Sequence, residues 1–223
     1  MKAPFDLTGK VFIVTGSGKG IGKGIVRCFV KAGAKCTINC NSNRAMAEET
    51  LKEIQAIGGE DCAFLYQADV SDYAQAEAMA KATYDHFGRI DGLVNNAALQ
   101  KQWMLDEYPI KDYDLLMHVN LGGYINMMRA VLPYLKETRG SITCISSVHG
   151  KRPTDFDPVY AMTKGGMHML LREAAIEFAK YGVRVNMIMP AGVKIEFKTG
   201  NPRPFQKPRL TPPREYYEKY PIY

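Results

Sequence analysis

The chain has 223 residues, of which 46% are hydrophobic and 23% charged, a balance that suits one compact globular domain with a substantial core. No apolar run reaches the roughly 18 residues of a membrane span, the first residues lack the apolar segment of a signal peptide, and the five cysteines show no CxxC spacing. The sequence therefore predicts a cytoplasmic protein with no membrane partner, no disulfide framework and no metal site.

Apolar β-branched runs alternate with helical patterns along most of the chain. Six strands are expected, at Lys10–Thr15, Lys35–Asn39, Cys62–Gln67, Gly92–Asn95, Ser141–Ser146 and Arg184–Ile188, and the helices between them at Ile21–Ala32, Arg44–Ile57, Tyr73–Phe87, Tyr113–Lys136 and Pro158–Tyr181. This alternation predicts an α/β fold with a doubly wound, Rossmann-like parallel sheet and helices on both faces. Such sheets bind ligands at the carboxyl ends of their strands.

Methionines recur at helical spacing in the second half of the chain, and core packing is the simplest interpretation of them. They are Met127, Met128, Met162, Met167 and Met169.

The segment after the sixth strand differs in composition from the rest. The formal net charge of the chain is +6, and residues 191–223 hold seven basic and three acidic side chains. Seven of the twelve prolines lie between Pro190 and Pro221, which argues against a continuous helix there. We divide the chain into a catalytic domain, 1–192, and a Pro-rich basic segment, 193–223, which forms a lid over the substrate or is poorly ordered. We expect no nucleic-acid partner, although basic residues interleaved with tyrosines keep that alternative open.

A glycine-rich turn, GSGKGIG, follows the first strand and precedes a helix. Its glycines, Gly16, Gly20 and Gly22, read GxxxGxG and not the more usual GxGxxG. Glycine permits positive φ angles and a close backbone approach, and the helix N-terminus behind the turn offers free N–H groups to a pyrophosphate. This context favours dinucleotide binding over a mere tight turn.

Tyr160 and Lys164 lie one helical turn apart in YAMTK, on the same helix face. A cation held there favours the phenolate and lowers the pKa of a tyrosine, so the pair is suited to proton transfer. A half-buried tyrosine beside a solvated lysine is the alternative, and the two residues alone do not exclude it.

Several motifs in one register resemble the short-chain dehydrogenases/reductases. They are TGSGKGIG at 15–22, Asp69-Val70, NNAA at 95–98, Asn120, ISS at 145–147, YAMTK at 160–164, and Pro190 followed by Gly192. The resemblance extends from about Leu7 to Gly192. Ala98 departs from the family's more usual glycine.

The resemblance implies a catalytic tetrad of Asn120, Ser147, Tyr160 and Lys164. Tyr160 would be the general acid or base, Ser147 would hydrogen-bond the substrate oxygen, Lys164 would hold the nicotinamide ribose and lower the pKa of Tyr160, and Asn120 would hold a water. Substrate contacts are expected from Ser147, His149 and Tyr160. Cofactor contacts are expected from Tyr160, Lys164, Gly16, Ser17, Lys19, Gly20, Ile21, Gly22, Asn41, Asp69, Val70, Asn95, Ala97, Pro190, Gly192 and Val193.

The end of the second strand favours NADP(H) over NAD(H). An acidic side chain there would accept hydrogen bonds from the 2′-hydroxyl of NAD and repel the 2′-phosphate of NADP, but residues 39–44 read NCNSNR. Lys19, with Arg44 as a second candidate, could bind that phosphate. We therefore predict NADP(H), with NAD(H) as the alternative.

The function implied is hydride transfer between a nicotinamide and a small-molecule carbonyl compound or alcohol. A nucleotide-binding regulatory protein without turnover is the alternative. Family members usually continue to a seventh strand, so the sequence predicts a sheet without that strand, in a shortened form or in a specialised member. A homo-oligomer, dimer or tetramer, is expected.

Overall fold

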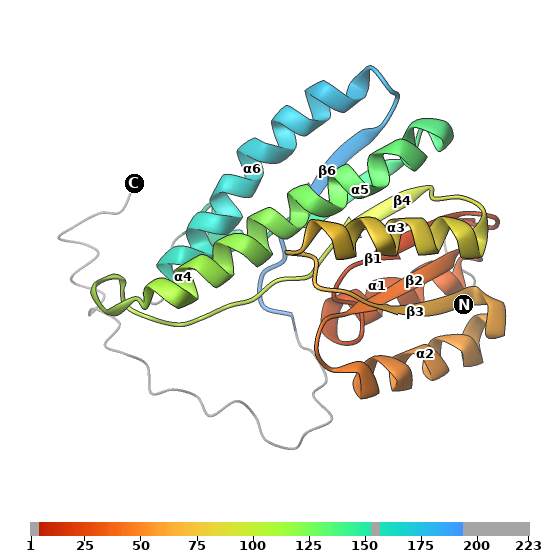
Figure 1. Ribbon diagram of the computed structural model, residues 1–223, viewed down its shortest axis with the longest axis horizontal. Helices are drawn as coiled ribbons and strands as arrows, with labels where there is room; N and C mark the ends of the chain where they lie inside the picture. The colour runs from red at the N-terminus through yellow and green to blue at the C-terminus, as the bar shows by residue number, and fades with distance from the viewer. Residues whose placement is uncertain (1–4, 153–156, 194–223) are drawn as a thin grey trace.

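The computed structural model describes residues 5–152 and 157–193, and its centre is a parallel sheet (Figure 1). The strands run in the order β3-β2-β1-β4-β5-β6, and every neighbouring pair is parallel. Their bounds are β1 Val11–Val14, β2 Lys35–Cys40, β3 Ala63–Gln67, β4 Gly92–Asn95, β5 Ser141–Ile145 and β6 Arg184–Ile188. The predicted Rossmann-like α/β fold is confirmed.

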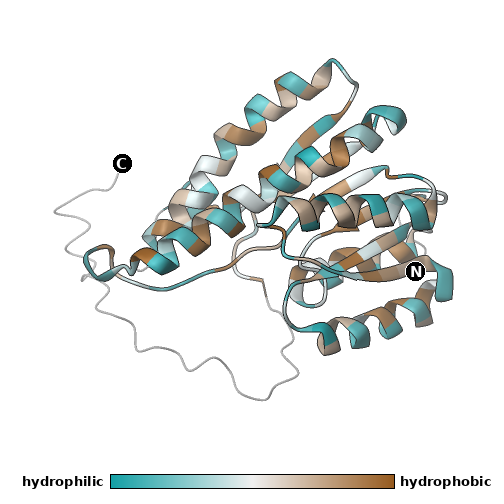
Figure 2. Ribbon diagram, in the orientation of Figure 1, coloured by the Kyte–Doolittle hydropathy of each residue, from teal (hydrophilic) through white to brown (hydrophobic). Residues whose placement is uncertain are grey.

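Helices cover both faces of the sheet, and none in the described ranges is long and apolar enough to cross a membrane. One buried cluster joins the sheet to α3, α5 and α6, and a second joins its other face to α1 and α2. Figure 2 shows hydrophobic and hydrophilic residues interspersed along the helices. The helices are α1 Gly20–Lys31, α2 Arg44–Gly58, α3 Tyr73–Phe87, α4 Ile110–Met117, α5 Gly123–Thr138 and α6 Pro158–Ala179.

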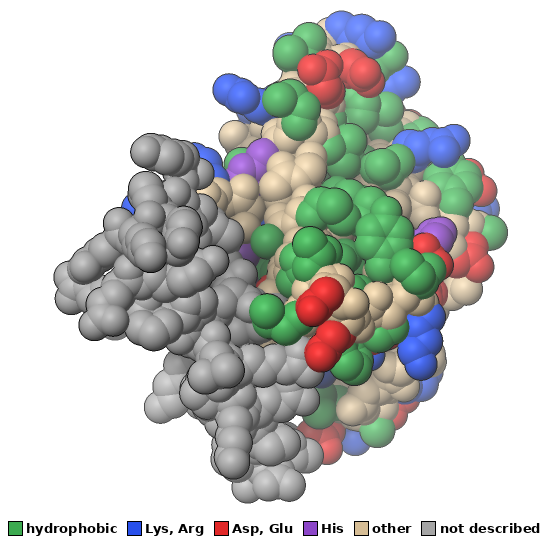
Figure 3. Space-filling view, turned by 90° about the vertical axis from the view of Figure 1, so that its left-hand side faces the viewer, with side chains coloured by type: hydrophobic (Ala, Val, Ile, Leu, Met, Phe, Trp, Pro, Cys, Tyr) green, Lys and Arg blue, Asp and Glu red, His purple; other side chains and the backbone are tan. Residues whose placement is uncertain are grey.

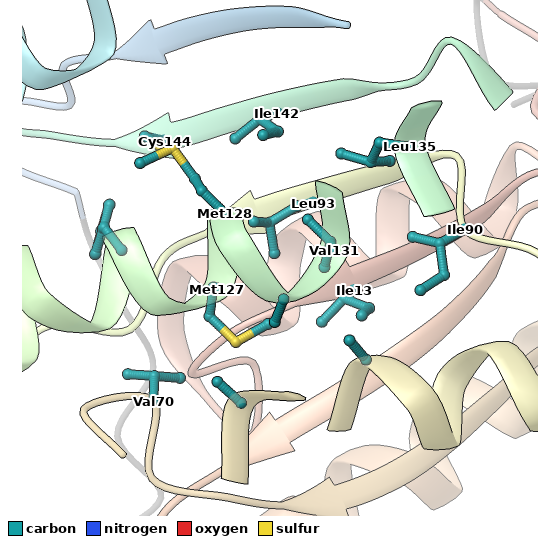
Figure 4. Close-up of a cluster of buried hydrophobic side chains, with 14 of the residues drawn as sticks. Ile13, Val70, Ile90, Leu93, Met127, Met128, Val131, Leu135, Ile142 and Cys144 are labelled. Carbon is teal, nitrogen blue, oxygen red and sulfur yellow. The ribbon is translucent and has the colours of Figure 1, made fainter. Parts of the chain in front are cut away.

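The larger cluster packs α5 onto the centre of the sheet (Figure 4). Met127 and Val131 of α5 are fully buried with Ile13 and Leu93 of the two central strands. Such a core fixes the central strands, and with them the positions of the loops at their carboxyl ends.

The methionine interpretation is correct for three residues and wrong for two. Met127, Met128 and Met167 are buried, but Met162 and Met169 are 46% and 58% exposed. Both lie on the face of α6 that turns away from the sheet, because α6 buries Met167, Leu171 and Ala174 instead. Helical spacing identifies residues that share a helix face, but it does not show whether that face is turned toward the sheet or toward solvent.

The predicted long helix from Tyr113 to Lys136 is interrupted. It begins earlier, as α4, and a single π-helical stretch, His118–Gly122, joins it to α5. The N–H of Gly123 donates to the carbonyl of His118, five residues back. The extra residue of a π-turn leaves no trace in the hydrophobic pattern, and such turns are frequent at functional sites.

The chain leaves β1 and β4 in different directions, because β1 pairs with β2 on one side and with β4 on the other. Helix α1 follows β1 on one face, and α5 lies on the other. A crevice therefore opens at the carboxyl ends of these central strands. The Pro-rich basic segment, beyond Val193, lies outside the described residues.

Candidate active site

The glycine turn after β1 depends on its glycines for conformation and for space. Gly16 and Gly20 have φ angles of 60° and 58°, in the left-handed region. A Cβ on Gly16 would lie 2.8 Å from the Cα of Ala97. The hydroxyl of Thr50 on α2 donates to the carbonyl of Gly18 at 2.8 Å and anchors the middle of the turn.

A cavity of about 450 Å³ lies over this turn and beside the N-terminus of α1. The first N–H groups of a helix have no partner within it, so they are available to an anion. Of the predicted cofactor residues, eight line this cavity: Gly16, Lys19, Gly20, Ile21, Asn41, Asp69, Val70 and Ala97. The glycine cradle, the free helix N-terminus and the cavity together fit a dinucleotide.

Three other predicted cofactor residues support the turn from behind the cavity. The hydroxyl of Ser17 donates to the carbonyl of Val14 at 2.6 Å. Gly22 leaves room for the side chain of Asn96, since a Cβ there would lie 2.6 Å from its Nδ2. Asn95 donates to the carbonyl of Tyr124 at 3.2 Å. Their hydrogen bonds and contacts stabilise the floor of the site.

A cluster of hydrogen bonds joins the ends of β1 and β4. The hydroxyl of Thr15 accepts from the N–H groups of Asn96 and Ala97 at 2.9 and 3.0 Å. The amide of Asn96 donates to the carbonyls of Thr15 and Gly16 at 2.8 and 3.1 Å. We call this the Thr15–Asn96 clasp, and it fixes the two central loops relative to each other.

No acidic side chain extends from the end of β2 toward the cavity. Asn39 is buried and accepts from the N–H of Gly16 at 3.0 Å, and Asn41 donates to the carboxylate of Asp69 at 2.9 Å. Lys19 is exposed at the rim of the cavity. Arg44 pairs with Glu48 at 2.8 Å along α2 and does not line the cavity.

Lys164 is a buried lysine, 1% exposed, held under the carboxyl end of β5. Its ammonium donates to the carbonyl of Ile145 at 2.8 Å and to the hydroxyl of Tyr124 at 3.5 Å. Burial lowers the pKa of Lys164 to about 8, against which the nearby Cys144 thiol acts weakly. The Lys164 ammonium lies 5.6 Å from the centre of the Tyr160 ring.

Tyr160 is half-buried, and burial raises its pKa above the usual 10. A hydrogen bond with Ser147 lowers that pKa and the charge of Asp157 raises it further. The expected net lowering of the Tyr160 pKa is therefore not found in the chain by itself, because desolvation of the phenol is the largest effect on that pKa. The hydroxyl of Ser147, 7% exposed, also accepts from the N–H of His149 at 3.2 Å.

Asn120 lies fully buried in the π-turn and joins the loop after β4 to α6. Its side chain accepts from the N–H of Leu99 at 2.8 Å and donates to the carbonyl of Leu99 at 2.9 Å. It also donates to the hydroxyl of Thr163, the residue before Lys164, at 3.2 Å. Asn120 thus orients the helical turn that carries Tyr160 and Lys164.

The predicted residues after β6 have separate positions. The carbonyl of Pro190 accepts from the N–H of Val148 at 3.1 Å and supports the turn that carries Ser147. Gly192 and Val193 are exposed and do not line the cavity. No group of three or more His, Cys, Asp and Glu side chains within the described ranges is arranged to hold a metal ion.

Comparison with known proteins agrees with this geometry. The family model for the short chain dehydrogenases matches residues 10–203. The chain belongs to the short-chain dehydrogenase/reductase family. Family membership implies a nicotinamide dinucleotide cofactor, NAD(H) or NADP(H), and a small-molecule substrate.

Three relatives in this family align with similar shares of this chain, although their names differ. Glucose 1-dehydrogenase 2 of Bacillus subtilis (strain 168) is 36% identical over 194 residues, which cover 86% of this chain and 74% of that protein. The 3beta-hydroxysteroid dehydrogenase 1 of Eggerthella lenta is 36% identical over 190 residues, 84% of this chain and 72% of that protein. The levodione reductase of Leifsonia aquatica is 31% identical over 194 residues, 83% of this chain and 70% of that protein.

Sequence reasoning missed two side chains of this short-chain dehydrogenase/reductase site. Tyr124 is buried on α5 and donates to the carbonyl of Ile145 at 2.9 Å, beside the Lys164 ammonium. Its position four residues after Asn120, on the same side of the helix, was the available signal. Asp157 lies just before α6 and is 0% exposed, and nothing in the local sequence marked it.

Proposed function

We propose that this chain is an NADP(H)-dependent oxidoreductase that interconverts a small carbonyl compound and the corresponding alcohol. The observation that carries the proposal is the buried ammonium of Lys164, held by Ile145 and Tyr124 one turn from the half-buried phenol of Tyr160. Burying a charge is costly, and perturbed titratable groups at the edge of a cleft are typical of catalytic sites.

In the reductive direction, Tyr160 gives its phenolic proton to the carbonyl oxygen. A nicotinamide cofactor, held at the glycine turn, would supply the hydride for the carbonyl carbon. Because burial raises the pKa of Tyr160, the phenol is protonated at neutral pH and is ready to act as an acid. The product alcohol carries both hydrogens, and the phenolate regains its proton from solvent.

The other members of the tetrad stabilise the charges that form during proton transfer and orient the groups that take part in it. The hydroxyl of Ser147 donates to the same substrate oxygen and stabilises the charge that develops there. The Lys164 ammonium stabilises the phenolate after proton transfer. Asn120 keeps the turn of α6 in place through Leu99 and Thr163.

Replacement of the phenol tests the mechanism. We expect Tyr160→Phe to lower kcat for NADPH-dependent reduction at least about 100-fold, because positioned acid–base groups contribute roughly 10²–10⁴-fold. NADPH absorbance would be followed against sugars, steroids, oxoacyl thioesters and simple ketones. Tyr113→Phe, on the exposed side of α4, is the matched control and should keep full activity. Full turnover by Tyr160→Phe would refute the mechanism, and NADPH binding without oxidation of any substrate would favour a regulatory role.

The cofactor preference is a separate prediction, based on Lys19 and the missing acid after β2. We expect a lower dissociation constant for NADPH than for NADH, measured by fluorescence titration. Lys19→Ala should weaken NADPH binding about tenfold and leave NADH unchanged, because a charge-assisted hydrogen bond to phosphate is lost. Lys52→Ala, an exposed lysine of α2 away from the cavity, is the control. Tighter binding of NADH by the unmodified chain would contradict the prediction.

A further inference from the structure

Two buried polar groups near Tyr160 have no role in the tetrad. The first is Asp157, which is 0% exposed at the position that precedes α6. Aspartate at this position usually accepts hydrogen bonds from the first N–H groups of the helix. The Asp157 side chain makes no such bond. Helix capping therefore does not explain why a carboxylate is buried here.

The two oxygens of Asp157 have different environments. Oδ2 accepts a hydrogen bond from the side-chain amide of Gln100, in the loop after β4. Oδ1 is buried and has no hydrogen-bond partner. Buried polar atoms without a partner are rare, since leaving a carboxylate oxygen unpaired is costly.

His149 contributes a second buried polar atom without a partner. Its Nδ1 makes no hydrogen bond, and its ring packs edge-on against the ring of Tyr160, with 5.9 Å between the ring centres. Burial raises the pKa of Asp157, while Gln100 and the charge of His149 lower it, so the imidazole lies within electrostatic range of the carboxylate. Both unsatisfied polar atoms thus belong to side chains that interact with Tyr160, the proton donor.

Asp157 also lies close in the sequence to the proton donor. Asp157 and Tyr160 are three residues apart, where α6 begins. The charge of Asp157 also raises the pKa of Tyr160. A substrate group bound by Asp157 would therefore lie close to the carbonyl that Tyr160 protonates.

We propose that Asp157 and His149 bind a hydroxyl group on the carbon next to the reacting carbonyl, so that the substrate is a hydroxy ketone or hydroxy aldehyde. A hydroxyl can donate to Oδ1 of Asp157 and, with its own oxygen, accept from Nδ1 of His149. An anionic substituent at this position would be repelled by the carboxylate, and an apolar one would leave both polar atoms unpaired. The inference rests on the proposed reductase function and deepens it.

Matched ketone pairs test the inference. The pairs are 2-hydroxycyclohexanone with cyclohexanone, and acetoin with butanone, each reduced with NADPH. We expect the intact chain to have a kcat/KM at least about tenfold higher for the hydroxylated member. Asp157→Ala should lower that value about tenfold or more for the hydroxylated ketones and less than about threefold for the simple ones. Because the comparison is between variants, intrinsic differences in ketone reactivity cancel.

The control for this pair of measurements is Asp106→Ala, an exposed aspartate in the same loop region as Gln100. It should leave the ratio between hydroxylated and simple ketones unchanged. A thermal melt and NADPH titration of each variant show whether it folds and binds cofactor.

A second measurement needs no variant. Cyclohexane-1,2-diol should inhibit the intact chain with an inhibition constant at least about tenfold lower than that of cyclohexanol, because only the diol has a second hydroxyl for Asp157 and His149. Equal inhibition constants, or an unchanged ratio in folded Asp157→Ala, would overturn the inference while the reductase function stands. Failure to oxidise NADPH with any ketone would instead count against the function itself.

Discussion

At the scale of single residues, Lys164 has the most consequential environment. Its ammonium is buried at the carboxyl end of β5, with a backbone carbonyl and a phenolic hydroxyl as partners. Burial lowers the pKa of Lys164 to about 8, from 10.5 in the unfolded chain. Burial of this cation lowers the free energy of unfolding. A group retained despite that cost is typical of a functional site rather than a structural one.

Because burial lowers the pKa of Lys164, the free energy of unfolding should depend on pH. Between pH 8 and 10.5 the unfolded chain binds the Lys164 proton and the folded chain does not, so this lysine's contribution to stability rises with pH in that window. Relative to Lys164→Met, the free energy of unfolding of the intact chain should rise by about 1 kcal/mol per pH unit from pH 8 to 10.

Denaturant unfolding of both proteins at several pH values measures this difference. Thiols and phenols with raised pKa values are present in both and largely cancel. Lys31→Met, at an exposed lysine at the end of α1, is the control variant. A flat difference for Lys164→Met would show that the ammonium is not desolvated.

At the scale of elements, the sequence predicts the strands well and the irregular segments poorly. The predicted strand at Gly92–Asn95 is confirmed to the residue, because a run this short between turn residues favours a strand over a helix. The π-turn at His118–Gly122 could not be predicted, although Asn120 itself could be. Its extra residue is stabilised by contacts with Leu99 and α6, which no local pattern encodes.

The contact between Gln100 and Asp157 could not be predicted from the sequence, for the same reason. Gln100 and Asp157 are 57 residues apart, and neither lies in a regular strand or in the interior of a helix. Loop residues meet only because the strands before them are adjacent in the sheet. The tetrad was predictable because its order and spacing repeat within a family, whereas a substrate pocket is built from residues that vary among members.

At the scale of the whole molecule, α6 presents an apolar stripe to solvent. Met162, Met169 and Ile176 are 46%, 58% and 73% exposed and are spaced seven residues apart along this helix. Residues with that spacing lie on one face of a helix. Hydrophobic side chains also gather at the end of the molecule where α4 lies (Figure 3). Exposed apolar side chains along one helix face favour contact with a second copy of the chain.

We expect the chain to form a dimer or tetramer through the α6 stripe. The double variant Met169→Glu/Ile176→Glu should shift the mass measured by light scattering to that of a monomer, because two carboxylates would be buried unpaired at the interface. Ile57→Glu, an exposed apolar residue at the end of α2, is the control and should keep the oligomer. A monomeric intact chain at the same concentration would contradict the prediction.

The Thr15–Asn96 clasp has a consequence for how specificity is encoded along the chain. Most residues that line the cavity lie between Gly16 and Val70, on the N-terminal side of Asn96 in the sequence, whereas Asn120, Ser147, Tyr160 and Asp157 lie on its C-terminal side. On the proposed assignments, coenzyme choice and substrate choice are therefore determined by separate stretches of sequence, which the side chains of Thr15 and Asn96 join by hydrogen bonds to the backbone. Either stretch can diverge while the other is kept, so one scaffold can combine different coenzymes with different substrates.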